Sequence, residues 1–433
     1  MTRQAIQVID LGFGDSGKGS IVDYLAWRYE ANWVVRFNGG PQAGHNVVLP
    51  DGRHHTFSQF SSATFQPGVR TLLSRFMLID PYAMRNEATH LEELGVPDAM
   101  ARTFIDARCP VITPPQQVAN RLRERARGAA AHGTCGMGIG ECVADAIEDK
   151  AAVLRAADLT NPALVRTKLS ASLLRKRAQM NDLMYLATPS ERHLFEDDSW
   201  IDRACALATD VASRANIISA DQAAQILINS SLTIFEGAQG VLLDEYFGFH
   251  PHTTWSITTY ANADQLLDET GVEFIRTRIG VLRPYLTRHG NGPLVTEDAQ
   301  ISDRLREPHN RYDGYAGRFR YGVLDLVMLR YALNACGGVH ALAVTCLDHL
   351  PHLPPLVCDH YTLRGDPFWP IAQETLEAME QVTQAMKQAV AHFSDWPTHS
   401  AQAWIAAMEA EIGLRIGLRS YGVTRERKSV AGG

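Results

Sequence analysis

The sequence predicts an α/β protein, with one large body around a mostly parallel central sheet, a phosphate-loop-like N-terminal loop and helical insertions. Residues 5–11 form a short apolar run with β-branched residues, which is typical of a buried parallel strand. A glycine-rich turn follows, residues 20–29 have helical spacing, and residues 33–37 form a second apolar run. A strand, a glycine loop, a helix and a strand in this order are typical of an open α/β sheet.

Later segments continue this pattern. Residues 115–230 are rich in Ala, Leu and Arg and predict a largely helical insertion. Short apolar strands are expected at residues 231–235 and 341–345, and each runs into polar residues where a site could lie. Residues 369–412 carry apolar side chains at steps of three and four, which predicts amphipathic helix.

Composition excludes several classes of protein. The chain has 433 residues, of which 45% are hydrophobic and 21% charged, as in ordinary globular proteins. A net charge of −7 argues against nucleic acid as a partner. No apolar run approaches about 18 residues, so no membrane span is expected. The N-terminus lacks a signal-peptide core and the seven cysteines have no paired spacing, which predicts a cytoplasmic protein with reduced thiols.

The first glycine loop, residues 12–20, fits two phosphate-binding patterns. Its glycines match the GxGxxG dinucleotide fingerprint, and they also match the phosphate loop except that Gly19 stands where Ser or Thr is usual. A dinucleotide site needs an acid about 20 residues further on, but the second strand ends in Arg-Phe-Asn at 36–38. Lys18 instead places a point charge where terminal phosphates would lie. We therefore expect nucleotide phosphates here, with Asp15 as a candidate magnesium ligand.

Three further segments in the first part of the chain carry candidate site residues. The loop at 38–46 has glycines that allow close backbone approach to a ligand, and its His45 could act as a general acid. Residues 133–140 form a glycine-dense loop able to wrap a phosphate or a sugar. Gln239 follows a strand as a glycine-flanked amide that could read a carbonyl and an N–H group together.

Two segments nearer the C-terminus carry charged candidates. Arg318 and Arg320 place two guanidinium groups on one side of an extended segment, which suits a carboxylate or a phosphate. Asp348 ends a strand, where its carboxylate can accept both N–H groups of a guanine edge.

Taken together, these segments resemble the adenylosuccinate synthetase family of purine biosynthesis, in the family's order from residue 6 to about residue 427. The block FEGAQG at 235–240 is identical to the family's. The other matching blocks are residues 14–19 for GDEGKG, 40–45 for GHNAGH, 133–140 for GTTGRGIG, 317–320 for the start of GRRRR and 345–348 for TKLD. Because these pieces recur along almost the whole chain, the resemblance implies a single domain over residues 1–433.

The resemblance implies a ligase that moves the γ-phosphate of GTP to the 6-oxygen of IMP, after which the amine of L-aspartate displaces the phosphate. Asp15 matches the base that takes the purine N1 proton, and His45 matches the acid on the 6-oxygen side. Asp15 and the carbonyl of Gly44 match the magnesium ligands. The family further implies Mg²⁺, GTP as phosphate donor with ATP as the alternative, and a homodimer.

The remaining residues carried over from the family fall into three groups. Contacts to the donor nucleotide are expected from Gly14, Asp15, Ser16, Gly17, Lys18, Gly19, Gly44, His45, Asn46, Arg320, Cys346, Asp348, Ser420 and Gly422. Contacts to the purine nucleotide are expected from Asp15, Lys18, Gln42, His45, Thr134, Cys135, Arg155, Gln239, Thr254 and Arg318. Contacts to the amino acid are expected from Gly314, Tyr315, Ala316, Arg318 and Arg320.

Several of these positions depart from the family pattern. The family's partner-subunit arginine has no direct counterpart, and Arg155 is the nearest candidate. The other departures are Ser16 for Glu, Gln42 for Asn, Cys135 for Thr, Met137 for Arg, Tyr315-Ala316 for Thr-Thr and Cys346 for Lys.

These departures leave alternatives open. The enzyme could form adenylosuccinate, act on another 6-oxopurine nucleotide such as GMP or dGMP to give a 2-aminoadenine-type product, or use an amine other than aspartate in a secondary pathway. Viral enzymes of the dGMP type are expected to lack the acid that matches Asp15. A non-catalytic nucleotide-binding homologue is the alternative of another class, but Asp15, His45, Lys18 and Gln239 together argue against it, since a pure binder needs neither base nor acid.

Overall fold

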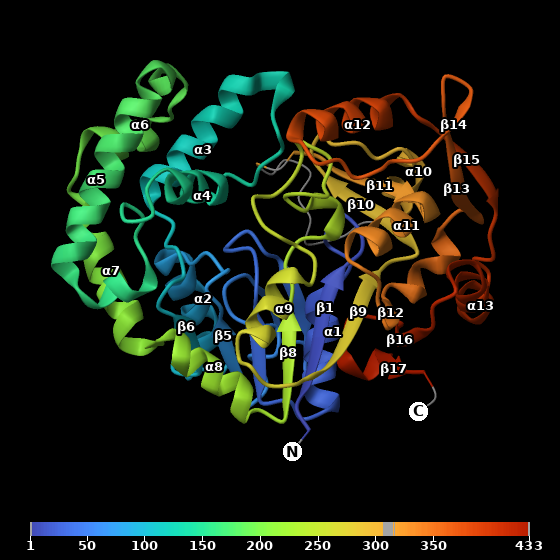
Figure 1. Cartoon of the computed structure of the whole chain (residues 1–433), viewed down its shortest axis with the longest axis horizontal. Coiled ribbons are helices and arrows are strands. Elements are labelled where there is room, and N and C mark those ends of the chain that lie inside the picture. The colour runs from blue at the N-terminus through green and yellow to red at the C-terminus, as the bar shows by residue number, and fades with distance from the viewer. Residues whose placement is uncertain (1, 306–314, 316, 432–433) are drawn as a thin grey trace.

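The computed structural model describes residues 2–305, 315 and 317–431, and its centre is a ten-stranded sheet (Figure 1). Every pair of neighbouring strands in this sheet is parallel except β16 and β17, which are antiparallel and form one edge. The predicted α/β class with a mostly parallel sheet is therefore confirmed. In spatial order the strands are β17 (Lys428–Val430), β16 (Ile416–Ser420), β12 (Ala341–Val344), β9 (Ile275–Leu282), β1 (Gln4–Asp10), β8 (Leu232–Glu236), β2 (Trp33–Arg36), β5 (Arg70–Leu73), β6 (Thr103–Asp106) and β7 (Asn216–Ile218).

Strand β1 shows why the apolar runs of the sequence become central strands. Ile6 and Val8 pack into a hydrophobic cluster that includes residues of α1 (Lys18–Arg28). Ala5 and Ile9 pack into a second and larger hydrophobic cluster. Successive side chains of a strand point to opposite faces, so a strand covered on both faces needs apolar residues at both parities. The four short strands expected from the sequence all lie in this sheet, within one or two residues of the expected bounds.

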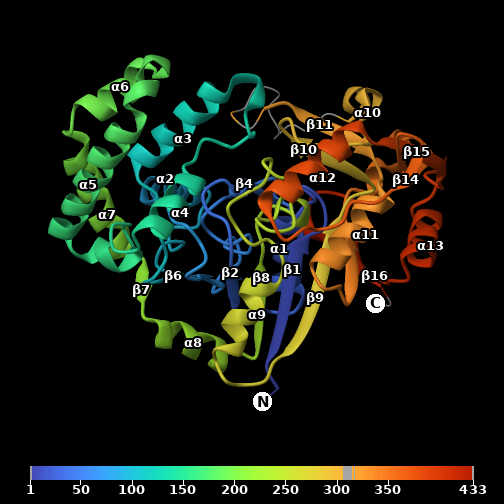
Figure 2. The same cartoon turned by 45° about the horizontal axis from the view of Figure 1, so that its top comes forward.

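The helical insertion stands to one side of the central strands, opposite the C-terminal helices (Figures 1 and 2). Its helices share a hydrophobic cluster that contains Leu122, Leu169 and Phe195. One short strand inside it, β7, pairs with β6 and forms the edge of the central sheet. The helices are α3 (Pro114–Arg127), α4 (Ile139–Glu148), α5 (Pro162–Met180), α6 (Pro189–Glu196), α7 (Trp200–Arg214) and α8 (Ala220–Asn229).

The expectation of amphipathic helix throughout residues 369–412 is wrong in part. The segment contains α12 (Leu376–Gln388) and α13 (Ala401–Ile412), but β15 (Val390–Asp395) separates them. Strand β15 pairs antiparallel with β13 (Leu356–Leu363). The short sequence Val-Ala-His-Phe-Ser-Asp of β15 is compatible with a strand as well as with a helix, and the backbone partner on β13 decides between the two.

The remaining elements surround the sheet or extend from its upper edge in Figure 1. These remaining elements are β3 (His45–Val48), β4 (His54–Phe57), α2 (Pro81–Glu93), α9 (Ala261–Asp268), β10 (Tyr285–His289), α10 (Ala299–Arg304), β11 (Phe319–Val323), α11 (Leu326–Ala335) and β14 (Asp366–Phe368). None of the described helices combines the length and the apolar composition that crossing a bilayer requires.

The buried N-cap of α11 predicts a pH dependence of stability. Asp325 accepts a hydrogen bond from the backbone N–H of Met328 and another from the Tyr361 hydroxyl, and burial raises its pKa to about 6. An acid whose pKa is raised by folding destabilises the fold increasingly as pH rises from about 4 to 6, and fully above that. We expect the free energy of unfolding of Asp325→Asn, measured with urea, to rise relative to that of wild type by about 2 to 3 kcal/mol between pH 4.5 and pH 8. A difference in free energy of unfolding between the two proteins that does not change with pH would contradict this prediction.

Candidate active site

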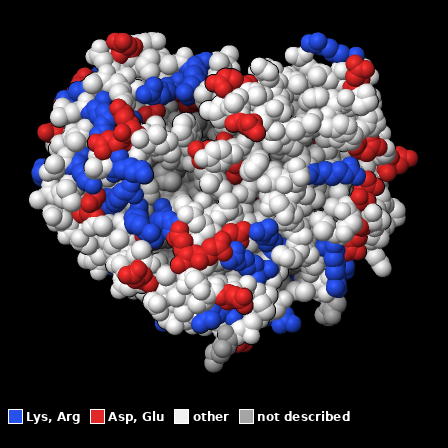
Figure 3. All heavy atoms as spheres, in the orientation of Figure 1, with Lys and Arg blue, Asp and Glu red and all other residues white. Residues whose placement is uncertain are grey.

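One cavity of about 770 Å³ lies at the carboxyl ends of β1, β2, β8 and β9, where open α/β sheets bind their ligands. Figure 3 shows a hollow in this region, with Lys and Arg side chains along the side of the helical insertion. Segments distant in the sequence meet there. The cavity is lined by residues of the phosphate loop, the loops at 42–46 and 132–135, helix α4, and Gln239, Thr254, Arg283, Arg288 and His289.

The phosphate loop reaches α1 through backbone in the left-handed region. Gly14, Asp15 and Gly17 have φ of 92°, 59° and 88°, so glycine is suited to two of these positions and Asp15 is held in a costly conformation. Lys18 begins α1, and the helix therefore directs its free N–H groups toward the cavity side of the loop. The local geometry supports the expected binding of an anion.

A buried carboxylate that the sequence interpretation missed holds this loop together. Asp10, the last residue of β1, accepts hydrogen bonds from the backbone N–H groups of Gly12 at 2.7 Å and Ser16 at 2.9 Å. It also accepts one from Nζ of Lys18 at 3.1 Å, and the Lys18 side chain is only 3% exposed. The signal available in the sequence was an acid at the end of an apolar strand, directly before the glycines.

The segment that carries Asp348 lies against the same loop. Thr345 donates a hydrogen bond from Oγ1 to the carbonyl oxygen of Ser16 at 2.7 Å. Strands β12 and β16 are parallel neighbours, so the segments that follow them, with Cys346 and Gly422, emerge at the same edge of the sheet. The candidate base-reading residues therefore lie on adjacent strand ends beside the phosphate loop, outside the main cavity.

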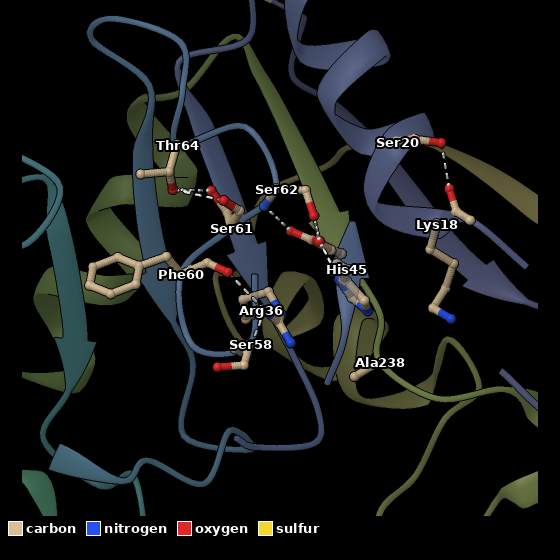
Figure 4. A network of polar contacts seen from close by, with 12 residues as sticks. Lys18, Ser20, Arg36, His45, Ser58, Phe60, Ser61, Ser62, Thr64 and Ala238 are labelled. Atoms are coloured by element: carbon tan, nitrogen blue, oxygen red, sulfur yellow. Dashed lines mark hydrogen bonds and ion pairs between the residues drawn. The ribbon is translucent and has the colours of Figure 1, made fainter. Parts of the chain in front are cut away.

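His45 belongs to a buried polar network (Figure 4). Its Nδ1 lies 2.6 Å from Oε1 of Glu236, the last residue of β8, and the backbone N–H of Ser62 donates to Oε2 of the same carboxylate at 3.0 Å. Burial lowers the pKa of His45, although Glu236 acts in the opposite direction. Burial alone would raise the pKa of Glu236, but His45 and Arg36 lower it overall.

These shifts define the protonation of the pair. With Glu236 ionised and His45 neutral, Nδ1–H donates to the carboxylate and the other ring nitrogen, Nε2, carries a lone pair. An anion placed beside the ring would favour the imidazolium and so supply an acid. Glu236 stood within the matched block at 235–240, but nothing in its immediate sequence indicated that it orients His45.

Asp15 lies in the cavity beside a group that the sequence did not predict. Nε2 of His289 is 3.2 Å from Oδ2 of Asp15. Burial alone would raise the pKa of Asp15, but His289, Arg283 and Lys18 together lower it. The carboxylate is therefore ionised at neutral pH and able to accept a proton.

The other expected purine-nucleotide contacts in the cavity include two side-chain amides. Both polar atoms of Gln42 and Oε1 of Gln239 are buried and lack a hydrogen-bond partner in the described part of the protein. Such groups are costly unless a ligand or water satisfies them. Thr254 and Cys135 also line the cavity, and burial raises the pKa of the Cys135 thiol, which therefore remains protonated.

Helix α3 fixes the loop that carries Thr134. Glu124 accepts hydrogen bonds from the backbone N–H groups of Gly133 at 2.9 Å and Thr134 at 3.1 Å. Asn120 donates from Nδ2 to the Thr134 hydroxyl at 3.0 Å. The loop is therefore positioned before any ligand binds.

Other expected contacts do not line the main cavity. Arg155 donates from Nη1 to the carbonyl of Arg108 at 2.7 Å, and Arg320 is paired with Glu297 at 2.7 Å. Arg318 and Asp348 are exposed, while Ser420 is buried and donates to the carbonyl of Gly422 at 3.1 Å. The Tyr315 hydroxyl accepts a hydrogen bond from Arg125 at 3.0 Å, and Gly314 and Ala316 lie outside the described residues.

The fold and the glycine-rich loops around one cavity define an α/β protein with a site suited to nucleotide phosphates, and comparison with known proteins gives its family. Residues 7–429 match the family model of adenylosuccinate synthetase, and the chain belongs to the adenylosuccinate synthetase family. The synthetase of Desulfovibrio desulfuricans is 32% identical over 439 residues, covering 98% of this chain and 99% of the relative. That of Caldanaerobacter subterraneus subsp. tengcongensis is 32% identical over 435 residues, covering 98% of each.

Solved structures show the same fold. The fully ligated adenylosuccinate synthetase of Plasmodium falciparum superposes with a TM-score of 0.77 at 20% identity, over 98% of this chain and 99% of the other. A succinoaminodeoxyadenylate synthetase of cyanophage S-2L, bound to dGMP and to dATP as energy donor, gives 0.62 at 16% identity, over 99% and 96%. Members of the family form C–N bonds and act on a purine nucleotide and aspartate.

Proposed function

We propose that the protein phosphorylates the 6-oxo group of IMP with GTP and displaces the phosphate with the amine of L-aspartate, giving an N6-succinyl-aminopurine nucleotide. The observation that carries this proposal is the meeting of Asp15, Lys18, His45 and Gln239 in one cavity. A carbonyl oxygen leaves poorly from a purine ring, and phosphorylation converts it into a good leaving group. The protein positions the reactants and neutralises the negative charge that is spread over the transferred phosphoryl group.

Each residue then has a distinct task. Lys18 and the N-terminus of α1 bind the transferred phosphate. Asp15 removes the proton from purine N1, which increases the negative charge on the 6-oxygen that attacks phosphorus. His45, oriented by Glu236, stabilises the 6-oxygen side of the phosphoryl group. The buried side-chain amides of Gln239 and Gln42 form their hydrogen bonds with the purine nucleotide.

The donor set is suited to magnesium. Asp15 and Gly44 both line the cavity, and a carboxylate and a backbone carbonyl are hard oxygen ligands. The described residues include no group of three or more His, Cys, Asp or Glu that could hold a metal alone. This fits Mg²⁺, which is typically bound through one or two carboxylates plus substrate phosphates and water. When bound, the ion would neutralise charge on the phosphates.

The segments outside the cavity are assigned to the remaining ligands. Cys346, Asp348, Ser420 and Gly422 would read the base of GTP, with ATP as the alternative donor. Arg318, Arg320 and the loop around Tyr315 would bind the carboxylates of aspartate. Arg155 does not reach the cavity of its own chain, so as a nucleotide contact it would act in the partner of a homodimer. We place this enzyme in the cytoplasm, and the spread of site segments supports one domain over residues 1–433.

A substrate matrix tests the proposal. The protein is incubated with Mg²⁺, GTP or ATP, and each of IMP, GMP and dGMP, with and without aspartate, and phosphate release and product mass are followed. We expect phosphate release and a succinyl product with IMP, GTP and aspartate. Release only with GMP or dGMP, or only with another amine, would transfer the proposal to the corresponding alternative. An absence of phosphate release in every combination would leave only a nucleotide-binding role.

A further inference from the structure

The contact between Asp15 and His289 joins two distant parts of the chain inside the cavity. His289 is the last residue of β10, and its Nε2 lies 3.2 Å from Oδ2 of Asp15. The two side chains are similarly placed relative to solvent, 32% exposed for His289 and 31% for Asp15. Both line the cavity, so the pair faces the space that the substrates would occupy.

The fold fixes both partners before a ligand binds. Asp15 has φ of 59° next to Gly14 at 92°, and a non-glycine residue keeps this conformation only where its surroundings determine it. The imidazole of His289 packs on the Phe319 ring with centroids 4.7 Å apart, and these two residues are opposite each other in the β10–β11 pairing. Backbone pairing and ring packing therefore set the position of Nε2.

The neighbouring cation of the loop has a different task. Lys18 is bonded to Asp10 at 3.1 Å, so it acts on Asp15 through its charge. His289 contacts Asp15 directly. A carboxylate held at one oxygen cannot rotate freely about its terminal bond, and the direction of its second oxygen is then determined.

We propose that His289 is a positioning residue for the candidate base: its Nε2–H holds Oδ2 of Asp15 so that Oδ1 is presented to the purine N1 proton. This inference rests on the proposed function, in which Asp15 removes that proton. Productive proton transfer needs hydrogen-bond distance and alignment, and a carboxylate that samples several orientations meets this requirement for a smaller fraction of time. Loss of the contact should therefore lower turnover without preventing the binding of the donor nucleotide.

Matched variants test the proposal. His289→Leu removes the hydrogen bond, and His289→Gln restores an N–H donor near the position of Nε2. The control is His193→Leu, which alters another histidine–aspartate pair, between His193 on helix α6 and Asp197 directly after that helix; His193 is 71% exposed. Thermal melting of each variant establishes that it is folded. We expect His289→Leu to lower kcat about tenfold with an unchanged KM for the donor nucleotide, and His289→Gln and His193→Leu to remain close to wild type.

Two further measurements separate positioning from a general structural role. In an Asp15→Asn background, His289→Leu should cause no additional loss, because the group that it positions no longer acts as a base. Crystals of the free His289→Leu protein should show the Asp15 carboxylate in an altered orientation. Wild-type turnover in the leucine variant, equal impairment of the glutamine variant, or an unchanged carboxylate would each overturn the proposal. The crystal comparison needs no turnover, so it also distinguishes failure of this inference from failure of the proposed function.

Discussion

Replacing Asp15 by Asn is expected to lower kcat by about 10²- to 10⁴-fold, the range typical of losing a positioned general base. The amide keeps the size of the side chain but cannot take up a proton at neutral pH. Because Asp15 is also the candidate magnesium ligand, the loss should fall toward the upper end of that range. Phosphate release measured at saturating substrates reports the change directly.

The folded state should tolerate this substitution. Asp15 is partly exposed in the cavity, and His289 can donate to the amide oxygen as it does to the carboxylate. The melting temperature and the affinity for the donor nucleotide without magnesium should therefore remain close to wild type. Asp197→Asn, in the exposed pair with His193, provides the matched control. A near-normal rate in Asp15→Asn would show that another group takes the N1 proton.

Replacing Asp10 by Ala is expected to reduce the free energy of unfolding by about 3 to 5 kcal/mol, because it leaves the buried Lys18 ammonium without its counter-charge. The same change also removes the acceptor of the Gly12 and Ser16 N–H groups. We therefore expect a raised KM for the donor nucleotide in addition to the lower stability. Urea unfolding and steady-state kinetics measure the two effects.

Two comparisons make the Asp10 prediction specific. Asp51→Ala breaks a pair with Arg53 in which Asp51 is 53% exposed, and it should cost less than about 1 kcal/mol. The double variant Asp10→Ala/Lys18→Met removes both buried charges and should recover part of the lost stability. A loss for Asp10→Ala no larger than that for Asp51→Ala would show that the buried pair does not stabilise the loop.

Much of the fold could be predicted because its signals are local. Apolar runs of four to eight residues bounded by glycine or polar residues indicate buried parallel strands, and the four predicted in this way all lie in the central sheet. The segment at 390–395 could not be assigned in the same way. Its residues suit a helix or a strand, and the partner strand β13 that decides between them begins at residue 356, far enough away to leave no local trace.

For the candidate site, the sequence by itself located the loops and the residue types. The glycine loop with Lys18, the histidine loop, the loop at 133–140 and Gln239 all follow from motif spacing, and the fold places them around one cavity. Motifs of this kind are contiguous because they shape backbone around a ligand, so they can be read along the chain.

Only the tertiary structure decided which side chains control those residues. Asp10 holds Lys18, Glu236 orients His45, and His289 contacts Asp15. The last two pairs join segments that are distant in the chain and adjacent in space, so sequence spacing carries no sign of them. Burial then strengthens the contacts made by Asp10 and Glu236, because a hydrogen bond or ion pair shielded from water acts in a lower dielectric than one at the surface, whereas the pair of Asp15 and His289 is partly exposed.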